Sequence, residues 1–185
     1  MSQLAQNKVT MNNLFLYRIF SYFLLVIAVI LGIAALFALL IALSNPALLL
    51  SVFVIVAVVI YSVASFLFLL NGIDGKRQQQ TKLRDWIKVN AYVSIVFVVM
   101  NLVQSIAVLQ DPSVFADAVK QVSTMQQTKS PLSTTLMMNV MKAVVWFLLF
   151  YALILGAHIA MTFRYLKEYA NLFGDKPNPS ANSPF

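Results

Sequence analysis

The sequence contains no cysteine, so disulfide bonds, iron–sulfur clusters, thiolate metal sites and cysteine nucleophiles are all excluded. Charged residues are scarce as well: they make up 10% of the chain, whereas a typical soluble domain has about 25%. Hydrophobic residues make up 61%, against about 45–50% in soluble domains. This balance is typical of an integral membrane protein.

Four stretches have no charged side chain at all: residues 19–43, 47–70, 89–109 and 143–163. Each contains at least 21 residues. At about 1.5 Å per residue, a helix of that length crosses a hydrocarbon core of roughly 30 Å. Helices are the expected form because lipid offers no partner to backbone N–H and C=O groups. The sequence therefore predicts an all-α, polytopic membrane protein with four transmembrane helices in an antiparallel bundle.

The predicted boundaries follow from the polar connections. We expect a four-helix transmembrane domain over residues 14–173, preceded by an N-terminal segment (1–13) and followed by a disordered tail (174–185) rich in Pro, Asn and Ser. The four helices are predicted at about 14–43, 46–70, 86–109 and 136–165. The first is longer than the roughly 7–15 apolar residues of a signal-peptide core, so we expect it to be retained as an anchor.

Two connections carry recognisable helix-end signals. Only Ser44, Asn45 and Pro46 separate the first two helices; proline suits a first helical turn, and Ser or Asn can cap it. This pattern predicts a tight hairpin. Asn71 and Gly72 predict the end of the second helix.

Basic residues fall mostly on one side of the predicted membrane. Ten lie on the side of the termini and the 71–86 connection: Lys8, Arg18, Lys76, Arg77, Lys82, Arg84, Lys88, Arg164, Lys167 and Lys176. Lys120 and Lys129 lie on the other side, and Lys142 is ambiguous. The positive-inside rule then predicts that both termini are cytoplasmic, and we expect a bacterial inner membrane. The bias of basic residues to one side of the membrane explains the net charge of +7 without a need for nucleic acid. The alternative is a specific surface for anionic lipids or a partner at the cytoplasmic face.

The external connection has a helical pattern of its own. Asp111 can cap a helix that starts at Pro112, and apolar residues then recur on one side. Residues 111–130 are therefore predicted to form a short amphipathic outer helix. It either packs on the bundle or offers a docking surface to another protein.

The third helix carries a polar stripe inside the predicted membrane. Asn90, Ser94, Asn101, Gln104 and Ser105 fall within about 100° of one another on a helix with 3.6 residues per turn. A lipid-facing amide would be costly to desolvate, so the stripe should face protein or enclosed water. The simplest explanation is hydrogen bonding between helices, and the alternative is a polar cavity, pore or ligand site.

The fourth helix offers partners at a matching depth. Asn139 and Lys142 lie near its outer end, so we expect them to form one intramembrane polar cluster with Asn101, Gln104 and Ser105. Ala152, Gly156 and Ala160 are spaced by four and form a small-residue ridge that permits close helix packing. If the ridge faces inward, Lys142 faces inward too; otherwise its ammonium group reaches the membrane surface.

Catalytic signals are few. His158 is the single histidine, and we expect it to hydrogen-bond another helix; ligation of a haem with a methionine is a remote alternative. No Asp or Glu lies in the uncharged spans, which argues against a proton-coupled pump. We find none of the Gly-rich phosphate loops, HExxH or GxSxG motifs, so no catalytic residue, metal site or cofactor is predicted.

These features favour a non-catalytic membrane protein that acts as a structural, accessory or assembly subunit of a membrane complex, or as a homo-oligomer. The expected partners are the lipid bilayer and other membrane subunits or further copies of the chain. The main alternative is a small channel or transporter whose polar path is lined by the third and fourth helices. A weaker one is a sensor or lipid-binding protein that uses the basic connection.

Overall fold

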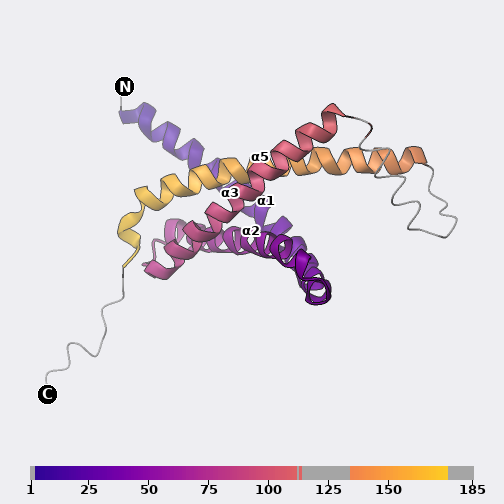
Figure 1. Ribbon diagram of the computed structural model, residues 1–185. Coiled ribbons are helices and arrows are strands. Elements are labelled where there is room, and N and C mark those ends of the chain that lie inside the picture. Colours follow the sequence, from indigo (N-terminus) through magenta and orange to yellow (C-terminus); the bar gives the residue numbers. More distant parts are fainter. Residues whose placement is uncertain (1–2, 112, 114–133, 175–185) are drawn as a thin grey trace, which may run out of the picture. The chain divides into compact units, whose positions relative to one another are not determined.

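The computed structural model describes residues 3–111, 113 and 134–174 of the chain. Four long helices form the fold (Figure 1): α1 (Gln3–Ser44), α2 (Leu49–Leu67), α3 (Thr81–Gln110) and α5 (Thr134–Glu168). Three short elements adjoin them: the 3₁₀ turn η1 (Pro46–Leu48), the π-helical turn η2 (Phe68–Asp74) and the 3₁₀ turn η3 (Ala170–Leu172).

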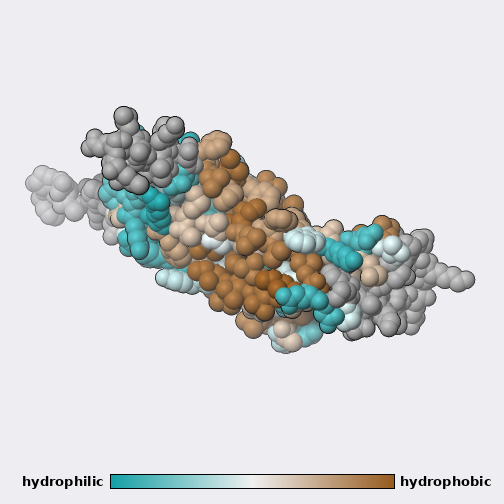
Figure 2. Space-filling view, turned by 90° about the horizontal axis from the view of Figure 1, so that it is seen from above, coloured by the Kyte–Doolittle hydropathy of each residue, from teal (hydrophilic) through white to brown (hydrophobic). Residues whose placement is uncertain are grey.

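Four helical segments are long and apolar enough to cross a membrane: Asn13–Ser44, Pro46–Asp74, Thr81–Gln110 and Thr135–Glu168. The all-α fold with four candidate spans is thereby confirmed. The helices extend beyond the predicted boundaries, because a helix need not stop where the hydrocarbon does. Large apolar side chains remain outward-facing, as in Leu50, which is 73% exposed, and Phe37, which is 66% exposed. Figure 2 shows a broad hydrophobic area on the face in view, as expected of a surface in contact with lipid.

Packing divides the chain into two units, and α3 and α5 run through both. One unit comprises Met1–Ile95 with Ala157–Phe185, and the other comprises Val96–Gly156. The first unit contains the α1–α2 hairpin, the first half of α3 up to Ile95 and the last part of α5 from Ala157. Among the described residues, the second contains the remaining parts of α3 and α5 together with Asp111 and Ser113.

The hairpin turn between α1 and α2 has the predicted chemistry. Asn45 has an extended backbone, and its Oδ1 accepts a hydrogen bond from the Ala47 backbone N–H at 3.3 Å. Pro46 occupies the first position of η1, where its missing N–H leaves no bond unmade. α1 and α2 pack against each other, and buried residues of α1 are spaced by three and four, among them Leu24 and Ala28.

The predicted stop at Asn71 and Gly72 is wrong. The helix continues through both residues as η2 and ends at Asp74. The backbone N–H of Gly75, its C-cap, donates to the Leu70 carbonyl at 2.9 Å, five residues back. Glycine is needed at position 72 because a Cβ there would lie 2.9 Å from the Phe68 ring. The glycine at this position therefore reflects close packing within the helix and does not mark a helix end.

The segment after α5 docks on the same region. The Gln79 backbone N–H donates to the Leu172 carbonyl at 2.7 Å, and the Gly174 N–H donates to the Gln79 carbonyl at 3.2 Å. The Phe173 ring stacks on the Phe68 ring with centroids 5.3 Å apart. These contacts tie the end of α5 to the connection between α2 and α3.

Two predicted segments lie mainly outside the described residues. Of the outer segment 111–130, only Asp111 and Ser113 are described, and of the tail 174–185 only Gly174. Asp111 Oδ1 accepts hydrogen bonds from the Ser113 hydroxyl at 2.6 Å and from the Ser113 backbone N–H at 3.0 Å; the helix that Asp111 was predicted to cap lies outside the described residues. These two bonds lower the pKa of the Asp111 carboxyl, the side-chain bond most.

Candidate functional site

The main polar site of the first unit is built around His158 on α5. Its side chain is 0% exposed, although it lies within an apolar span, in the last third of α5. A buried polar group in such a place is tolerated only when its hydrogen bonds are made. The partners of His158 come from α1, α2 and α5 itself.

Both ring nitrogens of His158 are engaged. Nε2 lies 2.9 Å from the Ser21 hydroxyl on α1, and Nδ1 lies 2.8 Å from the Tyr61 hydroxyl on α2. The Thr162 hydroxyl lies 2.9 Å from the Tyr61 hydroxyl and 3.3 Å from that of Tyr17. These five residues, the histidine network (Tyr17, Ser21, Tyr61, His158 and Thr162), are all 0–1% exposed.

The geometry assigns the imidazole tautomer. The Ser21 hydroxyl donates its one proton to the Tyr17 backbone carbonyl at 2.8 Å. It can therefore only accept from His158, which places the ring proton on Nε2. Nδ1 then carries a lone pair and accepts from the Tyr61 hydroxyl. A neutral imidazole satisfies both bonds, so the network needs no buried charge.

Aromatic packing completes the network. The Tyr17 ring lies parallel to the imidazole of His158, with centroids 4.7 Å apart and an interplanar angle of 7°. The Tyr61 ring meets the imidazole edge-on at 5.7 Å. Tyr165, on the next turn of α5, packs against Tyr17, and the centroids of the two rings are 4.9 Å apart. One imidazole thus joins three helices through two hydrogen bonds and two ring contacts.

Sequence reasoning expected His158 to bond another helix, and the structure shows bonds to two. It missed Tyr17, Ser21, Tyr61 and Thr162. A signal was present in the spacing: Tyr17 with Ser21, and His158 with Thr162, are separated by four residues and share a helix face. Without the helix pairing, however, these were hydroxyl residues among many.

The arrangement is suited to holding helices together. Both nitrogens of His158 are bonded and covered, so a substrate or a haem iron would have to displace Ser21 or Tyr61 to reach one of them. Within the described residues, no group of three His, Cys, Asp or Glu side chains is placed to hold a metal ion.

The residues of the predicted polar stripe of α3 differ in how deeply they are buried. Ser94 and Ser105 are buried, at 0% and 4% exposure, on the side of α3 that packs against protein. Asn90 and Asn101 are half-buried and bond their own helix: Asn90 Nδ2 donates to the Trp86 carbonyl at 2.8 Å, and Asn101 Nδ2 lies 3.5 Å from the Phe97 carbonyl.

The predicted cluster between the third and fourth helices is not formed. Gln104, Asn139 and Lys142 are all exposed. No hydrogen bond joins Asn101 or Gln104 to α5 among the residues that the structure describes. The expected match in depth is not enough, because apolar contacts set the rotation of the helices here: Phe97 meets Tyr151 edge-on at 6.4 Å.

The small-residue ridge of α5 packs only in part. Ala152 is fully buried, and a Cβ at Gly156 would lie 3.4 Å from Val98 Cγ1 on α3. Ala160, one turn further on, is exposed. The buried side of the helix there is formed instead by His158, Ile159 and Thr162. The close approach is thus limited to the crossing with α3 within the second unit.

No protein-family model, curated protein or solved structure matches this chain. Its function has to be inferred from its own residues.

Proposed function

We propose that the protein is a non-catalytic integral membrane protein that serves as a structural, accessory or assembly subunit of a membrane complex, or as a homo-oligomer. The observation that carries the proposal is Gln104. This side chain lies in a helix apolar enough to cross the membrane, it is exposed, and it has no hydrogen bond to any described residue.

Gln104 lies within the hydrocarbon by position. It is five residues before the end of the uncharged stretch 89–109, which is about 7.5 Å along the helix. An amide exposed to lipid at that depth forfeits its hydrogen bonds to water. Asn101, half-buried one turn deeper, extends the same polar face. A second protein surface that supplies donors and acceptors would satisfy this face, and that is how polar residues join membrane helices.

The absence of catalysis in this proposal is supported by the histidine network. His158, the side chain best suited to proton transfer near neutral pH, has both nitrogens bonded and no exposed surface. The alternative of a channel or transporter path along α3 has less support. Ser94, which would line that path, is 0% exposed, and its hydroxyl donates to the Asn90 carbonyl at 2.8 Å.

The proposed orientation has both termini and the 71–86 connection in the cytoplasm, with the turn at residues 44–46 and the 110–135 connection outside. It is supported by the ten basic residues on the first side against two or three on the second. The bacterial inner membrane is the proposed location.

The test of this function is photo-crosslinking in native membranes, with benzoylphenylalanine placed at position 104. Ile106 provides the matched control: it is 48% exposed, about 3 Å further along α3 and on the opposite side of the helix. The proposal expects a protein adduct at position 104, either a second copy of the chain or another membrane protein, and lipid adducts alone at position 106.

A companion variant separates assembly from folding. Gln104→Leu should leave the thermal stability of the detergent-purified monomer unchanged, since the amide has no partner within the described chain, and should reduce the size of the native complex. Identical adducts at positions 104 and 106, or a wild-type complex in the variant, would overturn the proposal.

A further inference from the structure

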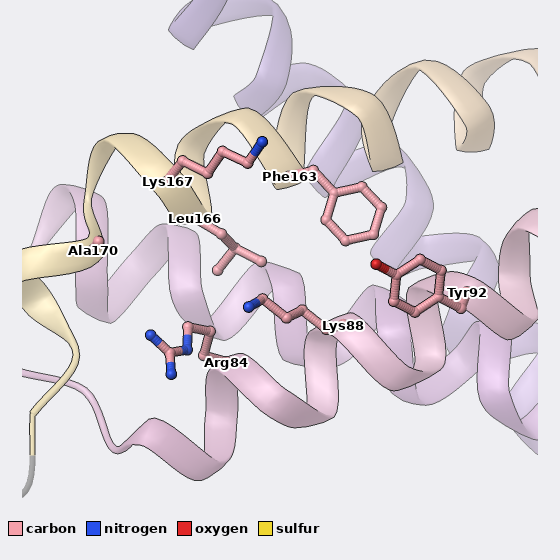
Figure 3. Close-up of a pocket in the computed structure, with 7 residues that line it drawn as sticks. All are labelled: Arg84, Lys88, Tyr92, Phe163, Leu166, Lys167 and Ala170. Atoms are coloured by element: carbon pink, nitrogen blue, oxygen red, sulfur yellow. The ribbon is translucent and has the colours of Figure 1, made fainter.

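A basic hollow lies between the start of α3 and the end of α5 in the first unit. Its volume is about 500 Å³. It is lined by three cationic and four uncharged residues: Arg84, Lys88, Tyr92, Phe163, Leu166, Lys167 and Ala170. In Figure 3 the Arg84 and Lys88 side chains extend from α3 into the space between the helices, and Lys167 comes from α5. No carboxylate belongs to this set of described lining residues.

The lining changes from cationic to aromatic along the axis of α3. Arg84, Lys88 and Tyr92 are spaced by four on one face of α3, so Tyr92 lies about 12 Å deeper than Arg84. On the opposite wall Phe163 meets Tyr92, with ring centroids 5.5 Å apart, and Lys167 lies one turn nearer the end of α5. The cations thus gather at the margin of the membrane, and the aromatic rings lie toward its interior.

Arg84 is only partly satisfied inside the protein. Its Nε is buried and has no hydrogen-bond partner within the described residues. The Asp85 carboxylate forms an ion pair with that atom at 3.7 Å, which is beyond hydrogen-bond distance, and the Asp85 side chain is 64% exposed. On the other side the guanidinium lies over the Phe173 ring, 5.9 Å from its centroid. Within the described residues, the Nε donor of Arg84 is therefore left without an acceptor at hydrogen-bond distance.

We propose that this hollow binds an anionic phospholipid, with the phosphate held by Arg84, Lys88 and Lys167 and an acyl chain lying along Tyr92 and Phe163. Arginine and lysine together suit a phosphate, the first through its fork of donors and the second as a point charge. Basic pockets between helices at a membrane margin favour anionic headgroups in this way. The gradient from cations to rings matches the order of groups in such a lipid. Neither the assembly role nor Gln104 is needed for this site.

The test is native mass spectrometry of the detergent-purified full chain, titrated with phosphatidylglycerol, phosphatidylcholine or inorganic phosphate. The test variant is Arg84→Gln with Lys88→Gln. The matched control is Arg77→Gln with Lys82→Gln, which removes the same two charges from exposed positions near the start of the same helix. We expect the test variant to bind phosphatidylglycerol at least about tenfold more weakly, and the control to stay within about twofold of wild type.

The three ligands distinguish the sources of the phosphate. Binding of phosphatidylglycerol above phosphatidylcholine, and no retention of inorganic phosphate at the same concentration, supports a lipid site. Equal retention of inorganic phosphate would overturn it, because the rings would then contribute nothing. Equal losses in the test and control variants would overturn it too, since charge alone would explain the binding. If Arg84→Gln unfolds the segment around Phe173, the pair Lys88→Gln and Lys167→Gln replaces it, with the same result expected.

Discussion

Replacing Tyr61 by phenylalanine removes one oxygen atom from the centre of the histidine network and leaves the ring in place. That oxygen lies 2.8 Å from His158 Nδ1 and 2.9 Å from the Thr162 hydroxyl. Without it, the nearest polar atom to Nδ1 is Thr162 Oγ1 at 3.5 Å, whose proton is donated to the His158 carbonyl at 2.8 Å. The imidazole acceptor is then left unpaired in a site with no exposed surface.

The magnitude follows from the unpaired acceptor. Leaving a buried acceptor without its donor costs about 1–3 kcal/mol. Single interhelical hydrogen bonds in lipid average about 0.6 kcal/mol, with a maximum near 1.7. The hydrogen bond from the Tyr61 hydroxyl to Nδ1 is lost, so we expect Tyr61→Phe to lower the free energy of unfolding by about 1–3 kcal/mol. In a chain of this size, at about 2–4 °C per kcal/mol, that corresponds to roughly 2–12 °C in the melting temperature.

The assay is thermal unfolding in lipid bicelles, followed by circular dichroism. Tyr22→Phe is the matched control, because Tyr22 is also on a membrane helix and packs edge-on against Phe66, but is 53% exposed. The control should change the melting temperature by less than 1–2 °C, roughly the effect of half a kcal/mol. Equal shifts in the two variants would refute the view that the network contributes through its hydrogen bonds.

Two further predictions concern packing and topology. Gly156→Leu should destabilise the second unit by about 1–3 kcal/mol, because even a Cβ at this position would lie 3.4 Å from Val98 on α3. Ala157→Leu, on the exposed side of α5, should have little effect, and equal melting temperatures of the two variants would contradict this prediction. Reporter fusions after Gln79 and after Lys176 should be cytoplasmic and one near Thr124 external, and an external reporter at Gln79 would reverse the proposed orientation.

The fold was predictable because hydrocarbon imposes a simple rule. A stretch of at least 21 residues without charge has to form a helix in lipid, and four such stretches predict four helices. Turn chemistry was equally local: Asn45 caps and Pro46 starts the next helix as expected. Gly72 shows the limit of a local rule. A glycine is required at this position because the Phe68 ring lies close to it, and a pattern of helix-end residues cannot reveal that contact.

The rotation of each helix about its axis was harder to predict. Membrane helices are apolar on every side, so hydrophobic periodicity does not show which side is buried. The stripe from Asn90 to Ser105 correctly placed two serines against protein, yet Gln104 at its edge is exposed. The partners of His158 depend on which faces of α1 and α2 meet, and that is a property of the packed structure.

Two kinds of polar residue in these helices can be told apart by whether their hydrogen bonds are complete within the chain. His158 is fully covered, and each nitrogen has a partner at 2.8–2.9 Å, so its bonds are used up in joining α1, α2 and α5. Gln104 is exposed in a helix of the same apolar character and has no such partner among the described residues. A satisfied group contributes to folding, while an unsatisfied one at a lipid-facing surface raises the free energy of the isolated chain. Association relieves that penalty, which is why an exposed glutamine in α3 points to a partner and a buried histidine in α5 does not.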